Sequence, residues 1–324
     1  MSDFDASMPR PEDVGNRVGV VTVTFNTAKF LPPFMDSCAA QRGLDFSIYC
    51  IDNNSKDGTV TVLKQDTPDF LQLTFNADNA GVAAANNQGI RQALGDGCEW
   101  ILLLNNDTTF EPTLFCGLVH AARSKGWLAV VPKIHFDVPA NHLWFAGGHF
   151  VAAKGHTGTH VGIGEHDRGQ HDAVATIDYA PTCCMLLHRS VFERVGLMDE
   201  AFFVYYDDTD FCWRLRQHGI ALGYWPQEQL VHKVGGSTGG IDSPFTTFMA
   251  ARNRLFFIKK HRGSTSAHMW SVVFMAYYVV RHLVKRWNPT GFMASVQGTR
   301  AYSTMQTMVP LLRGDSGKFP GGSG

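Results

Sequence analysis

The first 130 residues alternate between short apolar runs and segments with helical character. Short apolar strands separated by helices predict βαβ units, whose strands pair in parallel within one sheet. The runs lack polar alternation, which is typical of strands covered on both faces. The predicted strands are 18–25, 46–51, 71–75 and 100–104, and the predicted helices are 28–41, 57–65 and 80–94.

The rest of the chain has a different pattern. Residues 135–178 are rich in glycine and histidine, which leaves open a metal-binding tract or a polar excursion of loops and short strands. The segment 182–196 predicts a strand and then a short helix, and 220–226 is again strand-like. The last part predicts two helices, at about 245–261 and about 267–287.

A polar cluster follows each of the four predicted parallel strands. The carboxyl ends of parallel strands share one edge of the sheet, which is where open α/β sheets bind ligands. We therefore expect the four clusters to converge there. They are Thr24 to Asn26, "DNNSKDGT" (52–59), "NADNAG" (76–81) and "NNDTTFEP" (105–112).

Two of these clusters contain aspartates with more than one interpretation. Asp52 directly follows its strand, where it can accept hydrogen bonds from a base or a sugar, or cap the next helix. Asn105 and Asp107 are expected at the same edge of the sheet, where one carboxylate beside amide oxygens suits a hard cation such as Mg²⁺ or Mn²⁺. The alternative is a turn before a helix that Pro112 opens.

Composition narrows the class of protein. Hydrophobic residues make up 44% of the chain and charged residues 18%, which fits a globular protein with a sizeable core. The net charge of −1 excludes a polyanion-binding chain, so no nucleic-acid partner is expected. The seven cysteines form no C-x-x-C pair, which predicts reduced thiols and a cytoplasmic location.

Targeting and membrane signals are weak. Residues 1–17 lack the apolar core of a signal peptide, so we expect no secretory signal there. The strongest apolar run, 270–280, has about half of the roughly 20 residues that a membrane span needs. The P-loop and the dinucleotide-binding glycine motif after the first strand do not occur.

Six motifs, in this order along the chain, resemble those of family 2 glycosyltransferases. The similarity covers roughly 17–260 and is greatest to the bacterial branch that contains rhamnosyltransferases and galactofuranosyltransferases. It implies an α/β GT-A fold, with a mostly parallel nucleotide-binding sheet flanked by helices and a C-terminal helical extension. The motifs are "VVTVTFN", "IDNNSKDGT", "NAGVAAANNQGI", "ILLLNNDTTFEP", "VGLMDEAFFVYYDDTDFCWRLRQHG" and "LVHKVGGS".

The resemblance also implies an activity and a set of site residues. The activity is an inverting transfer from a nucleotide sugar, aided by Mg²⁺ or Mn²⁺. Asp208 matches the catalytic base, and Asp107 and His232 match the metal ligands. The nucleotide-sugar-binding residues implied in this way are Thr24, Asn26, Asp52, Asn54, Asn79, Gly81, Asn86, Asn105 and Asn106.

The chain departs from the family pattern in three places. Asn105 stands where many relatives carry the first aspartate of a D-x-D motif, which removes one charge from the metal site. Asp207 replaces the more usual glutamate before the base. The stretch 178–187 replaces the commoner Ser-Gly-Ala sequence, which alters the pocket near the donor sugar.

The stretch 205–219 crowds three aspartates onto the start of one predicted helix. Helical residues two apart point to nearly opposite sides, so Asp208 and Asp210 are not expected to serve one site. Asp210 stands four residues before Arg214, which is the spacing of a local ion pair that supports the helix. Asp207 either caps this helix or lies beside the pocket.

The leading hypothesis is therefore an enzyme that transfers rhamnose from dTDP-rhamnose to a hydroxyl of a glycan or lipid-linked acceptor in cell-surface polysaccharide synthesis. One alternative is a galactofuranosyl or other UDP-sugar transferase of the same fold. Another is a non-catalytic sugar-nucleotide-binding protein. The presence of Asp107, Asp208 and His232 favours the enzyme.

The helix at about 267–287 has three alternative environments. It lies on anionic lipid at the inner face of the cytoplasmic membrane, forms a homodimer interface, or packs on the catalytic domain.

The predicted organisation is a flexible N-terminus (1–16), a catalytic domain (17–240) with a nucleotide-binding half (about 17–130) and an acceptor-side half (about 131–240), a helical region (241–312) and a disordered tail (313–324).

Overall fold

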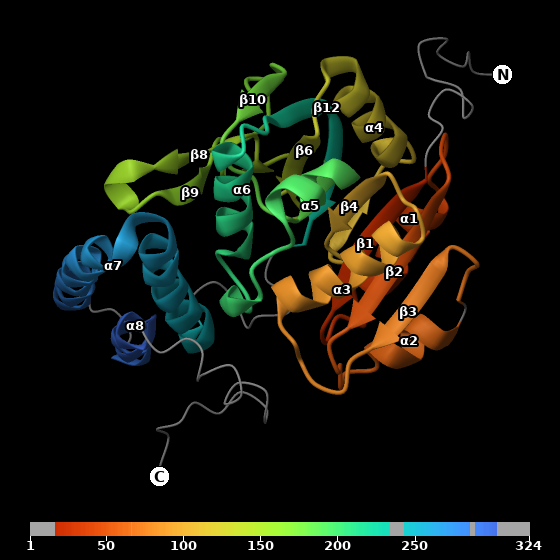
Figure 1. Ribbon diagram of the computed structural model, residues 1–324. Coiled ribbons are helices and arrows are strands. Elements are labelled where there is room, and N and C mark those ends of the chain that lie inside the picture. Colours follow the sequence, from red (N-terminus) through yellow and green to blue (C-terminus); the bar gives the residue numbers. More distant parts are fainter. Residues whose placement is uncertain (1–16, 66, 234–242, 286–288, 303–324) are drawn as a thin grey trace.

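The computed structural model describes residues 17–65, 67–233, 243–285 and 289–302. Its centre is a ten-stranded sheet in the order β10-β12-β6-β11-β4-β1-β2-β3, with β5 beside β12 and β7 beside β6 (Figure 1). The strands are β1 (Val18–Thr24), β2 (Phe46–Asp52), β3 (Leu71–Phe75), β4 (Trp100–Leu104), β5 (Thr108–Phe110), β6 (Ala129–Phe136), β7 (Leu143–Phe145), β10 (Ala175–Ile177), β11 (Cys184–His188) and β12 (Leu222–His232), while β8 (Gly148–Val151) and β9 (Thr157–His160) form a separate hairpin. The helices are α1 (Leu31–Ala39), α2 (Thr59–Gln65), α3 (Val82–Gly95), α4 (Leu114–Lys125), α5 (Arg189–Val195), α6 (Asp207–Gln217), α7 (Pro244–Lys285) and α8 (Pro289–Ala301), with short 3₁₀ turns at η2 (Ala152–Lys154) and η3 (Glu200–Phe202).

The first four predicted strands agree with β1 to β4 to within one residue. β1 pairs in parallel with β2 and β4, and β2 pairs in parallel with β3. All five residues of β4 are buried, as expected for an apolar strand covered on both faces. α3 lies close against β1 because Gly89 has no side chain: a Cβ there would stand 2.6 Å from Cγ1 of Val21.

The same sheet continues through the second half of the chain. β11 runs antiparallel between β4 and β6, and β6 pairs in parallel with β12. The strand predicted at 220–226 is longer than expected, because β12 continues to His232 through a register shift between Trp225 and Gln229. The excursion 135–178 folds into loops and short strands, as one of its two interpretations expects.

The C-terminal part is helical, and α7 and α8 lie at the opposite end of the molecule from β3 (Figure 1). Gly263 interrupts α7 with φ 86° and ψ 165°, between the two helices that the sequence predicts. Within the described ranges, no helix is both long enough and apolar enough to cross a membrane. All seven cysteines are buried free thiols.

The division into a catalytic domain (17–240) and a helical region (241–312) remains a proposal. The boundary drawn at about 130 between the two halves of the catalytic domain falls inside β6, so one sheet spans both. The proposed flexible N-terminus and disordered tail lie outside the described residues.

α7 holds the loop that leads into α6. The Asn253 side chain is fully buried, and its Nδ2 lies 2.8 Å from each of the main-chain oxygens of Phe202, Val204 and Tyr205, which share its two hydrogens. This loop needs such support because Phe203, Tyr205 and Tyr206 all have positive φ, between 63° and 67°. The C-terminal helix therefore determines how the chain enters α6.

We expect Asn253→Ala to lower the free energy of unfolding by about 2–3 kcal/mol, because it leaves buried carbonyl groups without a donor. Urea unfolding, followed by circular dichroism, measures the effect. Thr265→Ala, at an exposed position of the same helix, is the matched control and should unfold like the unchanged protein. Equal midpoints for the two variants would contradict the role assigned to Asn253.

Candidate active site

The ends of β1 and β2 form one buried hydrogen-bonded unit. Thr24 Oγ1 donates to Asp52 Oδ1 at 2.8 Å, and the Ser55 amide and hydroxyl donate to the same carboxylate at 3.0 and 2.6 Å. Asp52 is only 1% exposed, so its carboxylate closes the loop after β2. Contact between Asp52 and a nucleotide remains a prediction.

Asn26 and Asn54 lie in the same pair of loops, in the left-handed conformation that asparagine tolerates, with φ 53° and 65°. The Asn26 amide donates to Ser55 Oγ at 2.9 Å, and the Lys56 amide donates to Asn26 Oδ1 at 2.7 Å. Lys56 Nζ donates to Asn54 Oδ1 at 2.5 Å. The structure thus brings Thr24, Asn26, Asp52 and Asn54 together at one edge of the sheet.

The start of α3 joins this edge. Asn79 Oδ1 accepts from the Gly81 amide at 2.9 Å, and Gly81 has a positive φ of 86°. A Cβ on Gly81 would stand 2.7 Å from the main-chain oxygen of Phe203, so only glycine fits this position. Asn86 is buried in α3. Asn53, which the sequence did not single out, is 2% exposed, and its Nδ2 donates to the Gly81 oxygen at 3.1 Å.

The loop after β4 connects the edge to β12. Asn105 is exposed, whereas Asn106 is buried and donates to the main-chain oxygen of Val23. β5 follows at once and pairs Thr108 with His232. This pairing places His232 Nε2 3.2 Å from Asp107 Oδ1.

The Asp107–His232 pair has the donor set of a divalent cation site. Apart from its ionic contact with His232, Asp107 Oδ1 has no hydrogen-bond partner, and His232 Nδ1 is buried without one. Buried polar atoms of this kind are costly unless a ligand pairs with them. A carboxylate and an imidazole suit Mn²⁺, and a carboxylate suits Mg²⁺. The described residues contain no group of three or more His, Cys, Asp or Glu that could hold a metal ion. A bound cation would therefore take its other ligands from a phosphate and water.

The charge state of His232 bears on such binding. Burial alone would lower the pKa of His232, but the neighbouring Cys183 and the Asp107 carboxylate outweigh burial and raise the pKa to about 10. Without a cation, the contact with the Asp107 carboxylate favours the protonated imidazole. Because a histidine must be neutral to bind a metal, a cation would have to displace that proton.

Asp208 lies in the first turn of α6 and accepts three hydrogen bonds. Tyr179 donates its hydroxyl to Oδ2 at 2.9 Å, and the Thr209 amide and hydroxyl donate to Oδ1 at 2.6 and 3.1 Å. Burial raises the pKa of Asp208, although these donors favour the ionised form. A partly exposed carboxylate with a raised pKa suits a general base.

Asp207 differs from its neighbour. It is 5% exposed, and burial together with the charge of Asp208 raises its pKa to about 8. The hydroxyl of Tyr179 and the donors of Thr209 are all directed at Asp208, so they favour the ionised form of Asp208 over that of Asp207.

Asp210 points away from Asp208 into a separate network. Arg214 Nε stands 2.8 Å from Oδ2, which is the ion pair that the spacing predicts. Lys260 Nζ and His261 Nε2, both on α7, each stand 2.7 Å from Oδ1. Burial would raise the pKa of Asp210, but His261, Arg214 and Lys260 together lower it to about 2.

Three aromatic residues that the sequence did not single out connect the base to the Asp107–His232 pair. The Trp144 ring lies 4.4 Å from the His232 ring and 4.7 Å from the His160 ring, and His160 lies 5.9 Å from Tyr179. His160 Nδ1 contacts the Trp144 main-chain oxygen at 2.9 Å, which places its proton on Nδ1 and leaves Nε2 as an acceptor. Burial lowers the pKa of His160, so this ring is neutral at pH 7. Only an excess of histidine in 135–178 could have indicated it.

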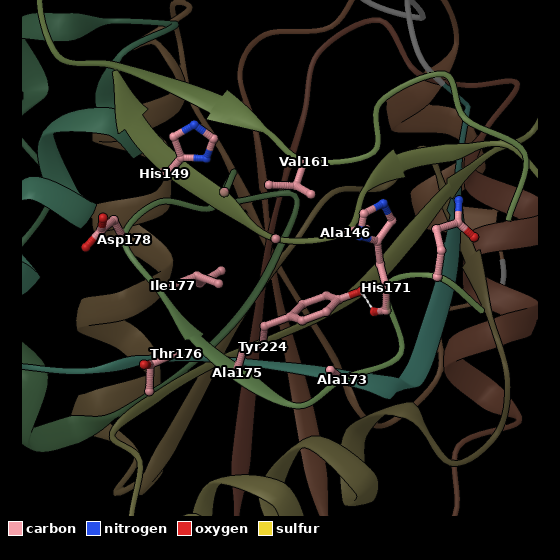
Figure 2. Close-up of a pocket in the computed structure, with 13 residues that line it drawn as sticks. Ala146, His149, Val161, His171, Ala173, Ala175, Thr176, Ile177, Asp178 and Tyr224 are labelled. Atoms are coloured by element: carbon pink, nitrogen blue, oxygen red, sulfur yellow. Dashed lines mark hydrogen bonds between the residues drawn. The ribbon is translucent and has the colours of Figure 1, made fainter. Parts of the chain in front are cut away.

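A cavity of about 360 Å³ adjoins this region (Figure 2). Figure 2 shows the Tyr224 ring at the cavity, with its hydroxyl donating to the His171 main-chain oxygen at 3.1 Å. His149 and Asp178 also line it. Neither the base nor the Asp107–His232 pair contributes to its walls, but Asp178, which directly precedes Tyr179 in sequence, does.

Comparison with known proteins identifies the class of enzyme. The family model described as glycosyl transferase family 2 matches residues 19–196, more than half of the chain. The chain belongs to glycosyl transferase family 2. The matched range contains Asp52 and Asp107, and it ends before Asp208 and His232.

Relatives of this glycosyltransferase cover most of its length. An N-acetylglucosaminyl-diphospho-decaprenol L-rhamnosyltransferase from Mycobacterium tuberculosis is 24% identical over 82% of this chain and 94% of that protein. The dTDP-rhamnosyl transferase RfbF from Shigella flexneri is 23% identical over 66% and 72%. The low-salt glycan biosynthesis hexosyltransferase Agl10 from Haloferax volcanii is 24% identical over 68% of each chain.

Two solved structures share the fold. GalNAc-T7 with UDP, GalNAc and Mn²⁺ superposes with a TM-score of 0.62 at 12% identity, over 95% of this chain and 58% of that one. The mannosyltransferase PcManGT from Pyrobaculum calidifontis, with GDP-Man and Mn²⁺, superposes with a TM-score of 0.55 at 16% identity, over 95% and 91%. The predicted GT-A architecture is confirmed.

We expect Tyr179→Phe to move the acid limb of the pH profile of kcat/KM to higher pH by about one unit. The tyrosine hydroxyl stabilises the ionised carboxylate of Asp208, so its loss raises the pKa below which the base is protonated. Tyr224→Phe is the control, because that hydroxyl bonds to the His171 oxygen instead. An unmoved acid limb in Tyr179→Phe would contradict the assignment of Asp208 as the titrating base.

Proposed function

We propose that this enzyme transfers a deoxyhexose, rhamnose from dTDP-rhamnose, to a hydroxyl of a glycan or lipid-linked acceptor, with inversion at the anomeric carbon. The observation that carries the proposal is that the Asp208 carboxylate and the Asp107–His232 pair lie at the two ends of one chain of contacts through Trp144, His160 and Tyr179. Two of the relatives are named as rhamnosyltransferases, which supports the choice of sugar.

The proposed reaction is a single displacement. Asp208 accepts the proton of the acceptor hydroxyl as its oxygen attacks the anomeric carbon, while the bond from that carbon to the diphosphate breaks. Attack opposite the leaving diphosphate inverts the configuration. The hydrogen bonds from Tyr179 and Thr209 hold both oxygens of Asp208, which fixes the direction of the carboxylate.

The residues at the sheet edge have complementary proposed roles. Thr24, Asn26, Asp52 and Asn54 shape the loops that receive the nucleoside, and the region of Asn79, Gly81 and Asn86 forms the adjacent wall. Asn105 and Asn106 lead into Asp107, which with His232 would hold Mg²⁺ or Mn²⁺. When bound, the cation would neutralise charge that develops on the departing diphosphate.

The proposed setting is the cytoplasm, where thiols stay reduced. The seven free, buried cysteines support this location. The product would enter a cell-surface polysaccharide, a role supported by the names of the rhamnosyltransferase relatives.

We expect Asp208→Asn to reduce kcat by about a hundredfold to ten-thousandfold and to leave the affinity for dTDP-rhamnose within a few-fold. The amide keeps the shape of the carboxylate but cannot accept the proton. Release of dTDP with candidate acceptors measures turnover, and calorimetry measures donor binding. Undiminished turnover by Asp208→Asn would show that Asp208 is not the base. If the unchanged enzyme turned over UDP-sugars and not dTDP-rhamnose, the donor would be a UDP-sugar.

We expect Asp107→Ala to weaken Mn²⁺-dependent binding of dTDP by at least about tenfold, because the cation loses a charged ligand. Calorimetric titration of dTDP with and without Mn²⁺ measures this directly. Asp178→Ala removes an equal charge at the exposed cavity wall and serves as the control. If Mn²⁺ raised the affinity for dTDP equally in both variants, the pair would not be the cation site.

A further inference from the structure

The second half of α7 exposes an unusual apolar surface. Of the twelve large hydrophobic residues that are exposed within the described ranges, nine lie between 269 and 293. Most occupy one stripe of α7, with helical spacing of three and four residues. We call the stripe the apolar face; it consists of Met269, Val272, Val273, Val280, Leu283 and Val284, which are 53–75% exposed.

This helix is apolar on two opposite sides. Phe274 and Tyr278, each 6% exposed, pack into the cluster that also holds Phe257 and Phe202. The core therefore already accounts for one side of the helix, and packing on the catalytic part cannot explain the apolar face. A groove of about 670 Å³ between α7 and α8, lined by Val272, Val279 and other residues, extends the exposed apolar surface.

The charge of the surrounding region is one-sided. Residues 243–302 contain nine Lys and Arg and no Asp or Glu, whereas the rest of the chain contains 19 Lys and Arg and 29 Asp and Glu. Arg252 and Lys260 are engaged with Ala201 and Asp210 inside the protein. Arg262 and Arg300 are exposed, and both flank the apolar face in sequence. The C-terminal helices thus combine a wide apolar stripe with basic residues and no acidic ones between 243 and 302.

We infer that the apolar face is a docking surface for an anionic lipid bilayer, on which α7 lies in the plane of the headgroups. An apolar stripe with basic flanks gains free energy both from burial in the acyl boundary and from attraction to anionic headgroups. A second copy of this chain would bring two regions of like charge together, which opposes association. The helices in the described ranges do not satisfy the requirements of a membrane span, so the helix lies on the surface.

The inference is independent of the donor and of the metal. It has a structural consequence, because the first half of α7 holds the loop before Asp208 through Asn253. The docking surface and the support of the base therefore belong to one helix, bent at Gly263.

Co-sedimentation of the full-length protein with vesicles tests the inference. The two vesicle types are pure phosphatidylcholine and an equal mixture of phosphatidylcholine and phosphatidylglycerol. We expect the protein to bind the mixed vesicles, to bind pure phosphatidylcholine vesicles more weakly, and to bind the mixed vesicles more weakly at high salt. The triple substitution Val273→Ser, Val280→Ser and Val284→Ser should weaken binding by about tenfold or more, since it removes three exposed apolar side chains.

Val138→Ser with Ile163→Ser is the matched control, because these apolar residues are equally exposed but lie in the excursion between β6 and β10. It should bind vesicles like the unchanged protein, and both variants should keep the affinity for dTDP and the circular dichroism spectrum. Failure of the unchanged protein to sediment with anionic vesicles would overturn the inference, as would undiminished binding by the triple variant. A dimer in light scattering that the triple variant disrupts would assign the face to a second copy instead.

Discussion

The geometry of the candidate site depends on the buried carboxylate of Asp210. Its two oxygens contact Arg214 on the same helix and Lys260 and His261 on α7. A carboxylate with no exposure is stable only when it is paired, so this contact fixes α6 against α7. Asp208 lies two residues earlier on α6, on the other side of the helix, and its position follows from the same contact.

The base is therefore supported by parts of the chain that lie far apart in sequence. α7 positions the loop before α6 through Asn253, and the hydroxyl of Tyr179 comes from the segment that follows β10. The excursion 135–178 provides Trp144 and His160, whose rings lie between Tyr179 and His232. The C-terminal helices are thus a structural part of the site, and their exposed apolar face lies on the helix that holds the base.

The sequence predicted those features that depend on local pattern. Apolar runs located β1 to β4, strand topology gathered Thr24, Asp52 and Asp107 at one edge, and the spacing from Asp210 to Arg214 predicted their ion pair. What depends on packing between distant segments was not predictable. Tyr179, His160 and Trp144 lie in a tract without periodicity, and nothing local indicates that they contact Asp208 or His232. The hydrogen bonds from Thr24 and Ser55 to the Asp52 carboxylate form only in the folded chain. The same is true of the burial that raises the pKa of Asp207.

The central claim is that the Asp107–His232 pair would hold the cation at the diphosphate of the donor, while Asp208 accepts the proton of the acceptor hydroxyl beside the anomeric carbon. The most direct measurement is a crystal structure with Mn²⁺ and a non-transferable analogue of dTDP-rhamnose. We predict Mn²⁺ bound by Asp107, His232 and the diphosphate, with the anomeric carbon facing the space beside Asp208. A diphosphate bound away from Asp107 and His232, or an anomeric carbon turned away from Asp208, would contradict the claim.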